Sequence, residues 1–266
     1  PLTFCQRAHT FFQRTGKKCI EIIKSKRIAL FGFGHIHLVQ RQINFQRQVF
    51  HRRKTNARHM EYQPGNQMMG QDIKLQTELY EKYWFPMEQS YGNEYATKFD
   101  WFMRDYLSVK TGAIPRIDKV YEEFKTYVQS NKAPKTITEV VQDIFKYSGY
   151  YVNMVLRKEA NTDLKKLFTN ILKLKVDVSY PFLLPVYNDY ATEIITIEDF
   201  KEIIKLVENY VFRRAICGIP TNSLNKTFAT LYKSINPSHY LESLKATFQL
   251  MENYKRFPND TEFEKE

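Results

Sequence analysis

The residues best suited to chemistry lie in one short stretch, RRAICGIPTNSLNK, at positions 213–226. It combines guanidinium groups, a thiol, a hydroxyl, amides and an ammonium group. Such a set could bind phosphate, form a catalytic loop, or cap and connect two helices. The candidate residues are Arg213, Arg214, Cys217, Gly218, Thr221, Asn222, Asn225 and Lys226.

The pattern around this stretch predicts a corner between two helices. Apolar residues recur at helical spacing up to Ile216, Gly218 can take the left-handed conformation that ends a helix, and Pro220 prevents its continuation. The hydroxyl of Thr221 is then expected to cap the next helix. Both arginines would lie in the last turns of the first helix, where cations interact with free carbonyl groups. We therefore expect a structural corner, with phosphate binding as the alternative.

The rest of the chain offers few groups for catalysis. Beyond residue 60, His239 is the only histidine and Cys217 the only cysteine, which we expect to be a buried structural thiol. No P-loop, GxSxG or HExxH motif occurs. Acidic pairs such as Glu122 and Glu123 fit solvated helix surfaces. The sequence therefore predicts no catalytic, cofactor-binding or metal-binding residue in this chain.

Residues 1–60 differ from the rest in charge. They hold 13 Lys and Arg against a single acid, Glu21, whereas the other 27 Lys and Arg are balanced by 28 acids. One interpretation is a basic arm that neutralises nucleic-acid phosphates. Another is a stretch that is not an evolved protein segment, such as an out-of-frame translation. The third is a metal site from Cys5, Cys19, His35 and His37, whose spacing matches no zinc ribbon or zinc finger.

Cysteine content and hydropathy bear on the compartment. The chain has three cysteines and no CxxC pair, which fits a reducing environment. No apolar run approaches the length of about 18 residues that a membrane span needs. The first residues lack the pattern of a signal peptide. We expect a cytoplasmic protein that does not enter a membrane.

The elements that position the corner are predicted to be helices throughout. An all-α domain is expected at 71–266, after a basic, poorly patterned stretch at 1–70. Two capping boxes are expected, Thr136 with Glu139 and Thr196 with Asp199. The expected helices are 72–84, which stops before Pro86, 93–109, one from 115, one from 136, 162–174, 180–190, 196–216 and one after Thr221. The expected core includes Phe99, Phe102, Phe124, Phe145, Phe182, Val207, Val211, Leu224 and Phe228.

Several segments after residue 78 carry a family resemblance. They are LYEKYWFPMEQSYG, FDWFMRDYLSVKTG, IPRIDKVYEEFKTYV, LKLKVDVSYPFLLPVYNDY, VENYVFRRAICGIPTNSLNKTFATLY and RFPNDTEFEKE. In this order they resemble the helical central region of the GmrSD-type (DUF262-domain) modification-dependent restriction endonucleases. The resemblance covers about residues 78–266, and the 213–226 corner is its most specific part.

The resemblance implies a function for the whole family rather than for these residues. In that family an N-terminal ParB-like domain hydrolyses nucleotide and a C-terminal HNH domain cuts DNA, using a nucleoside triphosphate and a divalent metal ion. This sequence has neither the DGQQRxTT-like nor the IPxYQRxYxW-like nucleotide stretch, and it ends before the nuclease region. The resemblance thus implies a non-catalytic helical connector, with the two missing domains in cis or in trans as partners and DNA as a partner of the full-length protein.

A second interpretation comes from charge. The chain would then be a nucleic-acid-binding module that uses the basic N-terminal arm and the 213–226 corner. Whether the chain is an enzyme in its own right stays open at this stage.

Overall fold

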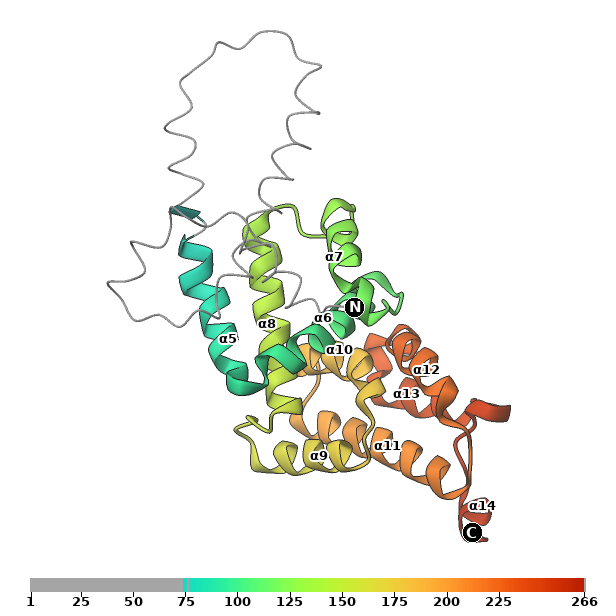
Figure 1. Cartoon of the computed structure of the whole chain (residues 1–266). Helices are drawn as coiled ribbons and strands as arrows, with labels where there is room; N and C mark the ends of the chain where they lie inside the picture. The colour runs from blue at the N-terminus through green and yellow to red at the C-terminus, as the bar shows by residue number, and fades with distance from the viewer. Residues whose placement is uncertain (1–73, 76, 266) are drawn as a thin grey trace. The chain divides into compact units, whose positions relative to one another are not determined.

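The computed structural model describes residues 74–265 except residue 76 (Figure 1). Within this part of the chain every regular element is a helix, which confirms the all-α prediction. None of the described helices is both long and apolar enough to cross a membrane. The predictions for residues 1–70, which include the basic arm, the Cys5/Cys19/His35/His37 set and the boundary near residue 70, lie outside the described residues.

The described chain divides into two compact units, and the first contains the residues up to Met103 together with Pro115–Phe145. Its core is rich in aromatic rings: Trp84 and Tyr91 both meet Phe99 edge to face, and Phe99 also contacts Phe102. Its elements are η1 (Tyr80–Trp84), α5 (Phe85–Tyr91), η2 (Gly92–Glu94), the start of α6 (Tyr95–Thr111), η3 (Ile117–Lys119), α7 (Val120–Gln129) and the start of α8 (Ile137–Val155).

The expected stop before Pro86 is wrong, because the chain stays helical through this residue. The five residues ahead of α5 form a π-helical turn, and the N–H of Phe85 donates to the carbonyl of Tyr80. Proline lacks an N–H, and its ring clashes with the carbonyl four residues earlier in a regular α-helix. The wider π-turn changes the hydrogen-bond pattern just before the proline, so Pro86 is accommodated in the first turn of α5.

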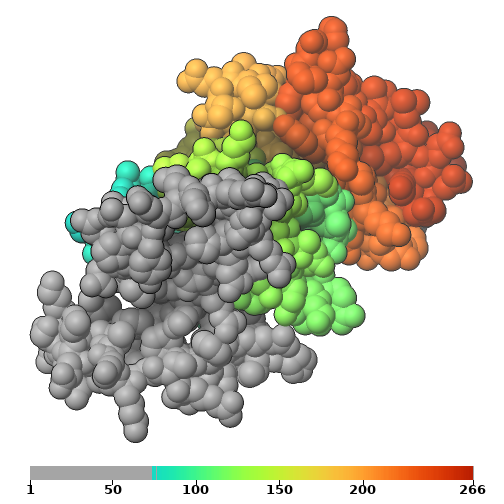
Figure 2. All heavy atoms as spheres, turned by 90° about the horizontal axis from the view of Figure 1, so that it is seen from above, coloured from blue at the N-terminus to red at the C-terminus, as the bar shows by residue number. Residues whose placement is uncertain are grey.

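The second unit contains Arg104–Ile114 and Lys146–Glu266. Within it α11 packs against α9 and α10, and α12 also packs against α10. In Figure 2 the orange and red atoms of the last helices form one continuous mass. The elements that follow α8 are α9 (Thr162–Lys173), η4 (Asp177–Ser179), α10 (Tyr180–Ala191), α11 (Ile197–Ile216), η5 (Thr221–Ser223), α12 (Leu224–Leu231), η6 (Tyr232–Ser234), η7 (Pro237–His239), α13 (Tyr240–Gln249), η8 (Asn253–Lys255) and α14 (Asp260–Phe263).

Both predicted capping boxes are present. At the start of α8, the N–H of Glu139 donates to the hydroxyl of Thr136, and the N–H of Thr136 donates to the Glu139 carboxylate. Thr196 and Asp199 make the same reciprocal pair at the start of α11. Each box satisfies donors that the first turn of a helix leaves free, which fixes where α8 and α11 begin.

Eight of the nine predicted core residues are buried, and Phe145 is the exception. Its side chain is 36% exposed and meets the ring of Tyr83 edge to face. The buried stripe of α8 runs instead through Val141, Ile144 and Ser148. Since neighbouring positions on a helix point about 100° apart, Phe145 lies at the edge of this stripe.

Candidate functional site

The helix α11 ends in the turn that the sequence predicts. Gly218 has a φ of 59°, in the left-handed region, directly after the cap residue Cys217. The N–H of Gly218 donates to the carbonyl of Ala215, and the N–H of Ile219 donates to the carbonyl of Arg214. These two bonds define a Schellman motif, so the glycine closes the helix and uses its last carbonyls.

Arg214 lies inside the protein at this helix end. Its side chain is only 1% exposed, and its guanidinium stands 5.1 Å from the ring centre of Tyr210. One terminal nitrogen donates to the carbonyl of Pro220 (2.8 Å) and to the hydroxyl of Ser223 (3.2 Å). The other donates to the carbonyls of Tyr254 (2.8 Å) and Arg256 (3.4 Å). The side chain thus joins the corner to a segment near the C-terminal end of the described chain.

The acceptors around Arg214 are neutral. Three of the four are backbone carbonyls and the fourth is a hydroxyl, while the Nε atom is buried without a hydrogen-bond partner. A buried charge is tolerated when dipoles or partners replace the lost water. Here carbonyl dipoles perform this task, and no carboxylate accepts a hydrogen bond from the guanidinium.

Arg213 holds the same C-terminal segment from the neighbouring position. It donates to the carbonyl of Pro258 (3.2 Å), forms an ion pair of 2.6 Å with Asp260, and lies over the ring of Phe263 at 4.9 Å. The hydroxyl of Tyr210 adds a bond of 2.8 Å to the carbonyl of Lys255. We call residues 253–264 the C-terminal strap, because three side chains of α11 fix its backbone.

Three other candidate residues of the corner lie on its surface. Asn222, Asn225 and Lys226 are exposed, and Cys217 is half-buried rather than buried as expected. The expected cap by Thr221 is wrong. The positions before η5 and α12 are occupied by Pro220 and Ser223, and neither makes a side-chain cap bond. A 3-10 turn starts at Thr221, and the hydroxyl of Ser223 is used by Arg214 instead.

Three components of the hydrogen-bond network around α11 and the strap could not be identified from the sequence. Tyr210 reads as part of the apolar face of α11, Ser223 as an ordinary polar residue, and the strap carbonyls leave no trace in side-chain patterns. The spacing of Tyr210 and Arg214, one helical turn apart, is the one local signal that could have paired them.

A second concentration of titratable groups lies in the first unit, around Glu88 on α5. Burial raises the pKa of Glu88 to about 7, although hydrogen bonding to the indole of Trp84 and to the hydroxyls of Tyr95 and Tyr80 opposes this rise. A buried carboxyl with a raised pKa also occurs in the second unit. Burial raises the pKa of Asp105 well above its usual range, and the negative charge of Asp177 raises it further. The positive charge of Arg104, 3.5 Å away, lowers it. Perturbed carboxyls often mark functional sites, but structural burial alone also produces them.

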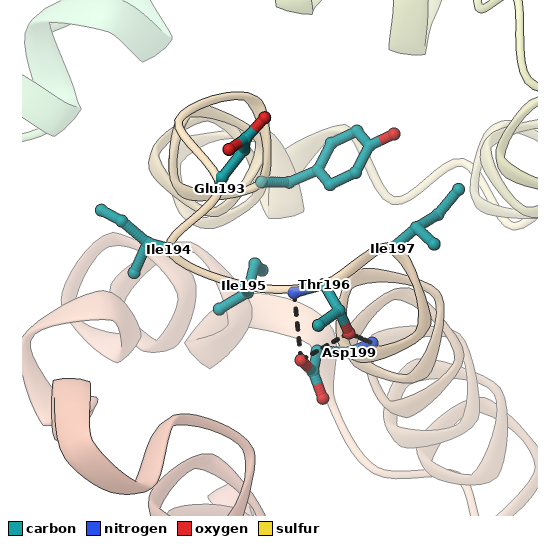
Figure 3. A pocket seen from close by; sticks show the side chains of 7 residues that line it. Glu193, Ile194, Ile195, Thr196, Ile197 and Asp199 are labelled. Atoms are coloured by element: carbon teal, nitrogen blue, oxygen red, sulfur yellow. Dashed lines mark hydrogen bonds between the residues drawn. The ribbon is translucent and has the colours of Figure 1, made fainter.

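A surface hollow of about 450 Å³ lies between α10 and α11 (Figure 3). Tyr190, Glu193, three isoleucines, Thr196 and Asp199 line it. The carboxylate of Asp199 is already used in the capping box of α11, and Figure 3 shows Glu193 on the other side of the loop. The hollow therefore lacks a set of polar groups that converge on one point.

The described residues contain no group of three or more His, Cys, Asp or Glu that could hold a metal ion. What the corner can do chemically is to bind backbone carbonyls and carboxylates through two arginines. Comparison of the chain with protein-family models, with curated proteins and with solved structures finds no match.

Proposed function

We propose that this chain is a helical connector of a GmrSD-like (DUF262) restriction-defence protein that acts in the cytoplasm. In full-length relatives, nucleotide hydrolysis in one domain is coupled to cleavage of modified DNA in another. The nucleoside triphosphate and the divalent metal ion would bind in those other domains, and this chain would transmit the coupling without catalysing either reaction.

The observation that carries this proposal is the attachment of the strap to α11. Tyr210, Arg213 and Arg214 hold the strap through four of its backbone carbonyls. Contacts to carbonyls fix the path of a segment whatever its side chains are. A rigid helix that grips the backbone of a following segment is suited to pass a displacement along the chain.

The alternative function, nucleic-acid binding by the basic arm and the corner, receives less support from the corner as observed. Arg214 is buried, and its terminal nitrogens donate hydrogen bonds to protein groups. Arg213 forms an ion pair with Asp260. A phosphate could not reach Arg214 without displacing the strap. Among the polar candidate residues of the corner, Thr221, Asn222, Asn225 and Lys226 are exposed to solvent.

The test of the connector function uses the complete protein with its nucleotide and nuclease domains. Arg214→Lys keeps the positive charge but cannot bridge the corner and the strap, because an ammonium lacks the planar fork of a guanidinium. We expect nucleotide hydrolysis to persist while DNA cleavage falls roughly five- to a hundredfold, the usual range of a coupling energy. Lys226→Gln, at an exposed position of the same corner, is the control and should change neither activity.

Two results would contradict the proposal. One is unchanged cleavage in Arg214→Lys when hydrogen exchange shows that the strap has loosened. The other is hydrolysis of nucleotide, or cleavage of modified DNA, by the present chain alone after purification from contaminating enzymes.

A further inference from the structure

Arg213 on α11 and Arg256 within the strap are each paired with a carboxylate of the short helix α14. Arg213 binds Asp260 at 2.6 Å, and the Nε of Arg256 binds Glu262 at 3.0 Å. Asp260 is 80% exposed and Glu262 is 30% exposed, so these are surface ion pairs. Such pairs contribute only about 0–1 kcal/mol each, because water and salt compete with them. A polyanion, whose linked charges bind together and release counterions, can therefore replace the carboxylates.

The positive charge of this region does not depend on the two ion pairs. Arg214 stays in place through its bonds to carbonyls and has no carboxylate among its hydrogen-bond acceptors. If α14 moves away, Arg213 and Arg256 lose their neutralising partners next to this fixed charge. The result is a pair of accessible guanidinium groups, the side chains that bind phosphate most specifically, beside the fixed positive charge of Arg214.

Aromatic rings accompany these charges. Phe212 is 43% exposed, and its ring lies 6.0 Å from that of Phe263, which in turn lies under the guanidinium of Arg213. Guanidinium groups interleaved with accessible aromatic rings are typical of surfaces that bind single-stranded nucleic acid, where phosphates meet cations and bases stack on rings.

The helix α14 is built so that it can move as a unit. It is one turn long, and its N-terminal N–H groups are capped by its own neighbour, since Asn259 accepts from the N–H of Glu262. The buried Pro258 immediately before it is fixed through its carbonyl by Arg213. The two ion pairs and the rings around Phe263 attach α14 to its neighbours.

We propose that α14 is a carboxylate lid over a binding surface for single-stranded nucleic acid. Asp260 and Glu262 occupy the positions of two phosphates, and the lid opens at Pro258–Asn259 when a strand takes their place. The phosphates then bind Arg213 and Arg256, while a base stacks on Phe212. This proposal goes beyond the connector function and does not depend on it, because it concerns α14 and not the carbonyl contacts of Arg214.

The experiment compares two double variants of the full chain with equal loss of negative charge. Asp260→Asn/Glu262→Gln removes the carboxylates of the lid and keeps the shape of the side chains. Glu252→Gln/Glu264→Gln is the matched control, because both glutamates are exposed; Glu252 directly precedes the strap and Glu264 is its last residue. Binding of a labelled single-stranded oligodeoxythymidylate is measured by fluorescence anisotropy between 50 and 200 mM salt, about the range in which phosphate contacts show their salt dependence. Thermal melting of each variant is recorded in parallel.

We expect the lid variant to bind about tenfold more tightly than the control variant at low salt, with a steeper dependence on salt. Adding Arg213→Ala and Arg256→Ala to the lid variant should remove this gain. The gain should be smaller on a duplex of the same length, whose stacked bases cannot reach Phe212.

Equal affinity of the two double variants would overturn the proposal, because net charge alone would then explain any gain. It would also be overturned if the gain survived the loss of both arginines. Neither result touches the connector function, whose test depends on Arg214 and on the activities of other domains.

Discussion

The guanidinium of Arg214 lies 2.8 Å from the carbonyl oxygen of Tyr254, 40 residues further along the chain. The same side chain also holds Pro220 and Ser223, so one residue joins the end of α11, the start of η5 and the strap. Because all of these acceptors are neutral, the arginine acts as a buried tie between backbone segments. It is not a free ligand for a phosphate group.

Replacing Arg214 should therefore be costly for folding. Arg214→Met fills a similar volume but leaves the carbonyls of Pro220, Tyr254 and Arg256 without their donor. Since a hydrogen bond to a charged group contributes about 1.5–3 kcal/mol, we expect the loss of these three bonds to lower the free energy of unfolding by about 3 kcal/mol or more. Urea titration of the variant gives this value directly.

Arg213→Ala provides the comparison at the neighbouring position. Its ion pair with Asp260 is exposed to water, so the loss should be about 1 kcal/mol or less. Similar losses at the two positions would show that burial does not distinguish them, against the network described here.

The two glycines of α8 and α11 allow a test with opposite signs. Gly218→Ala places a Cβ on a residue with φ of 59°, although nothing lies within 4 Å of that Cβ, so the cost is conformational alone. We expect a destabilisation of about 1 kcal/mol. Gly149→Ala lies inside α8 with equally open space, and it should stabilise the protein by about 0.4–1 kcal/mol. Melting temperatures that shift in the same direction would contradict this prediction.

Alanine substitutions at two threonines compare the observed N-cap at Thr196 with the predicted one at Thr221. Thr196 accepts from the N–H of Asp199 in a complete capping box, so Thr196→Ala should cost about 1 kcal/mol. Thr221 begins η5 and is not its cap residue, so Thr221→Ala should change the free energy of unfolding by less than about 0.5 kcal/mol. Chemical denaturation should show a larger loss in the free energy of unfolding for Thr196→Ala than for Thr221→Ala. If Thr221→Ala instead lost more stability than Thr196→Ala, the result would support the N-cap role that the sequence predicts for Thr221.

Much of the fold could be predicted because its signals are local. The capping boxes of α8 and α11 depend on residues three positions apart, and Gly218 ends α11 through its own backbone freedom. The passage through Pro86 could not be predicted, because it depends on a π-turn that no side-chain pattern encodes. The exposure of Phe145 depends on how far the buried stripe of α8 extends, which neighbouring helices decide.

The sequence identified the 213–226 corner as a candidate site, but it did not identify the C-terminal strap as the segment that the corner binds. Sequence reasoning expected the arginines to interact with carbonyls at the end of their own helix. Arg214 does bind the carbonyl of Pro220 just after its helix, and Arg213 binds the carboxylate of Asp260, but both also bind carbonyls 40–45 residues away. Backbone carbonyls are present at every position, so composition and spacing cannot single out the strap. The family assignment remains a prediction from the resemblance of the segments after residue 78.

The last prediction concerns pH and the first unit of the chain. The pKa of Glu88 is about 7 in the folded protein, against an ordinary value of 4.5, mainly because the side chain is largely buried. Between these two values the folded state holds a proton that the unfolded state has already released. The contribution of Glu88 to the free energy of unfolding must therefore fall as the pH rises from about 4.5 to about 7, and then level off.

Glu88→Gln removes the titrating group while keeping hydrogen-bonding atoms beside Trp84, Tyr95 and Tyr80. We expect the variant to lose most of this decline and to be more stable than the parent chain at pH 8, with little difference at pH 4.5. Glu123→Gln, an exposed position on α7 in the same unit, is the matched control and should follow the parent curve. Urea titrations at half-unit steps of pH measure the effect. A parent curve that rises between pH 5 and 7, with a Glu88→Gln curve parallel to it, would show that Glu88 is charged throughout and that its burial does not control its ionisation.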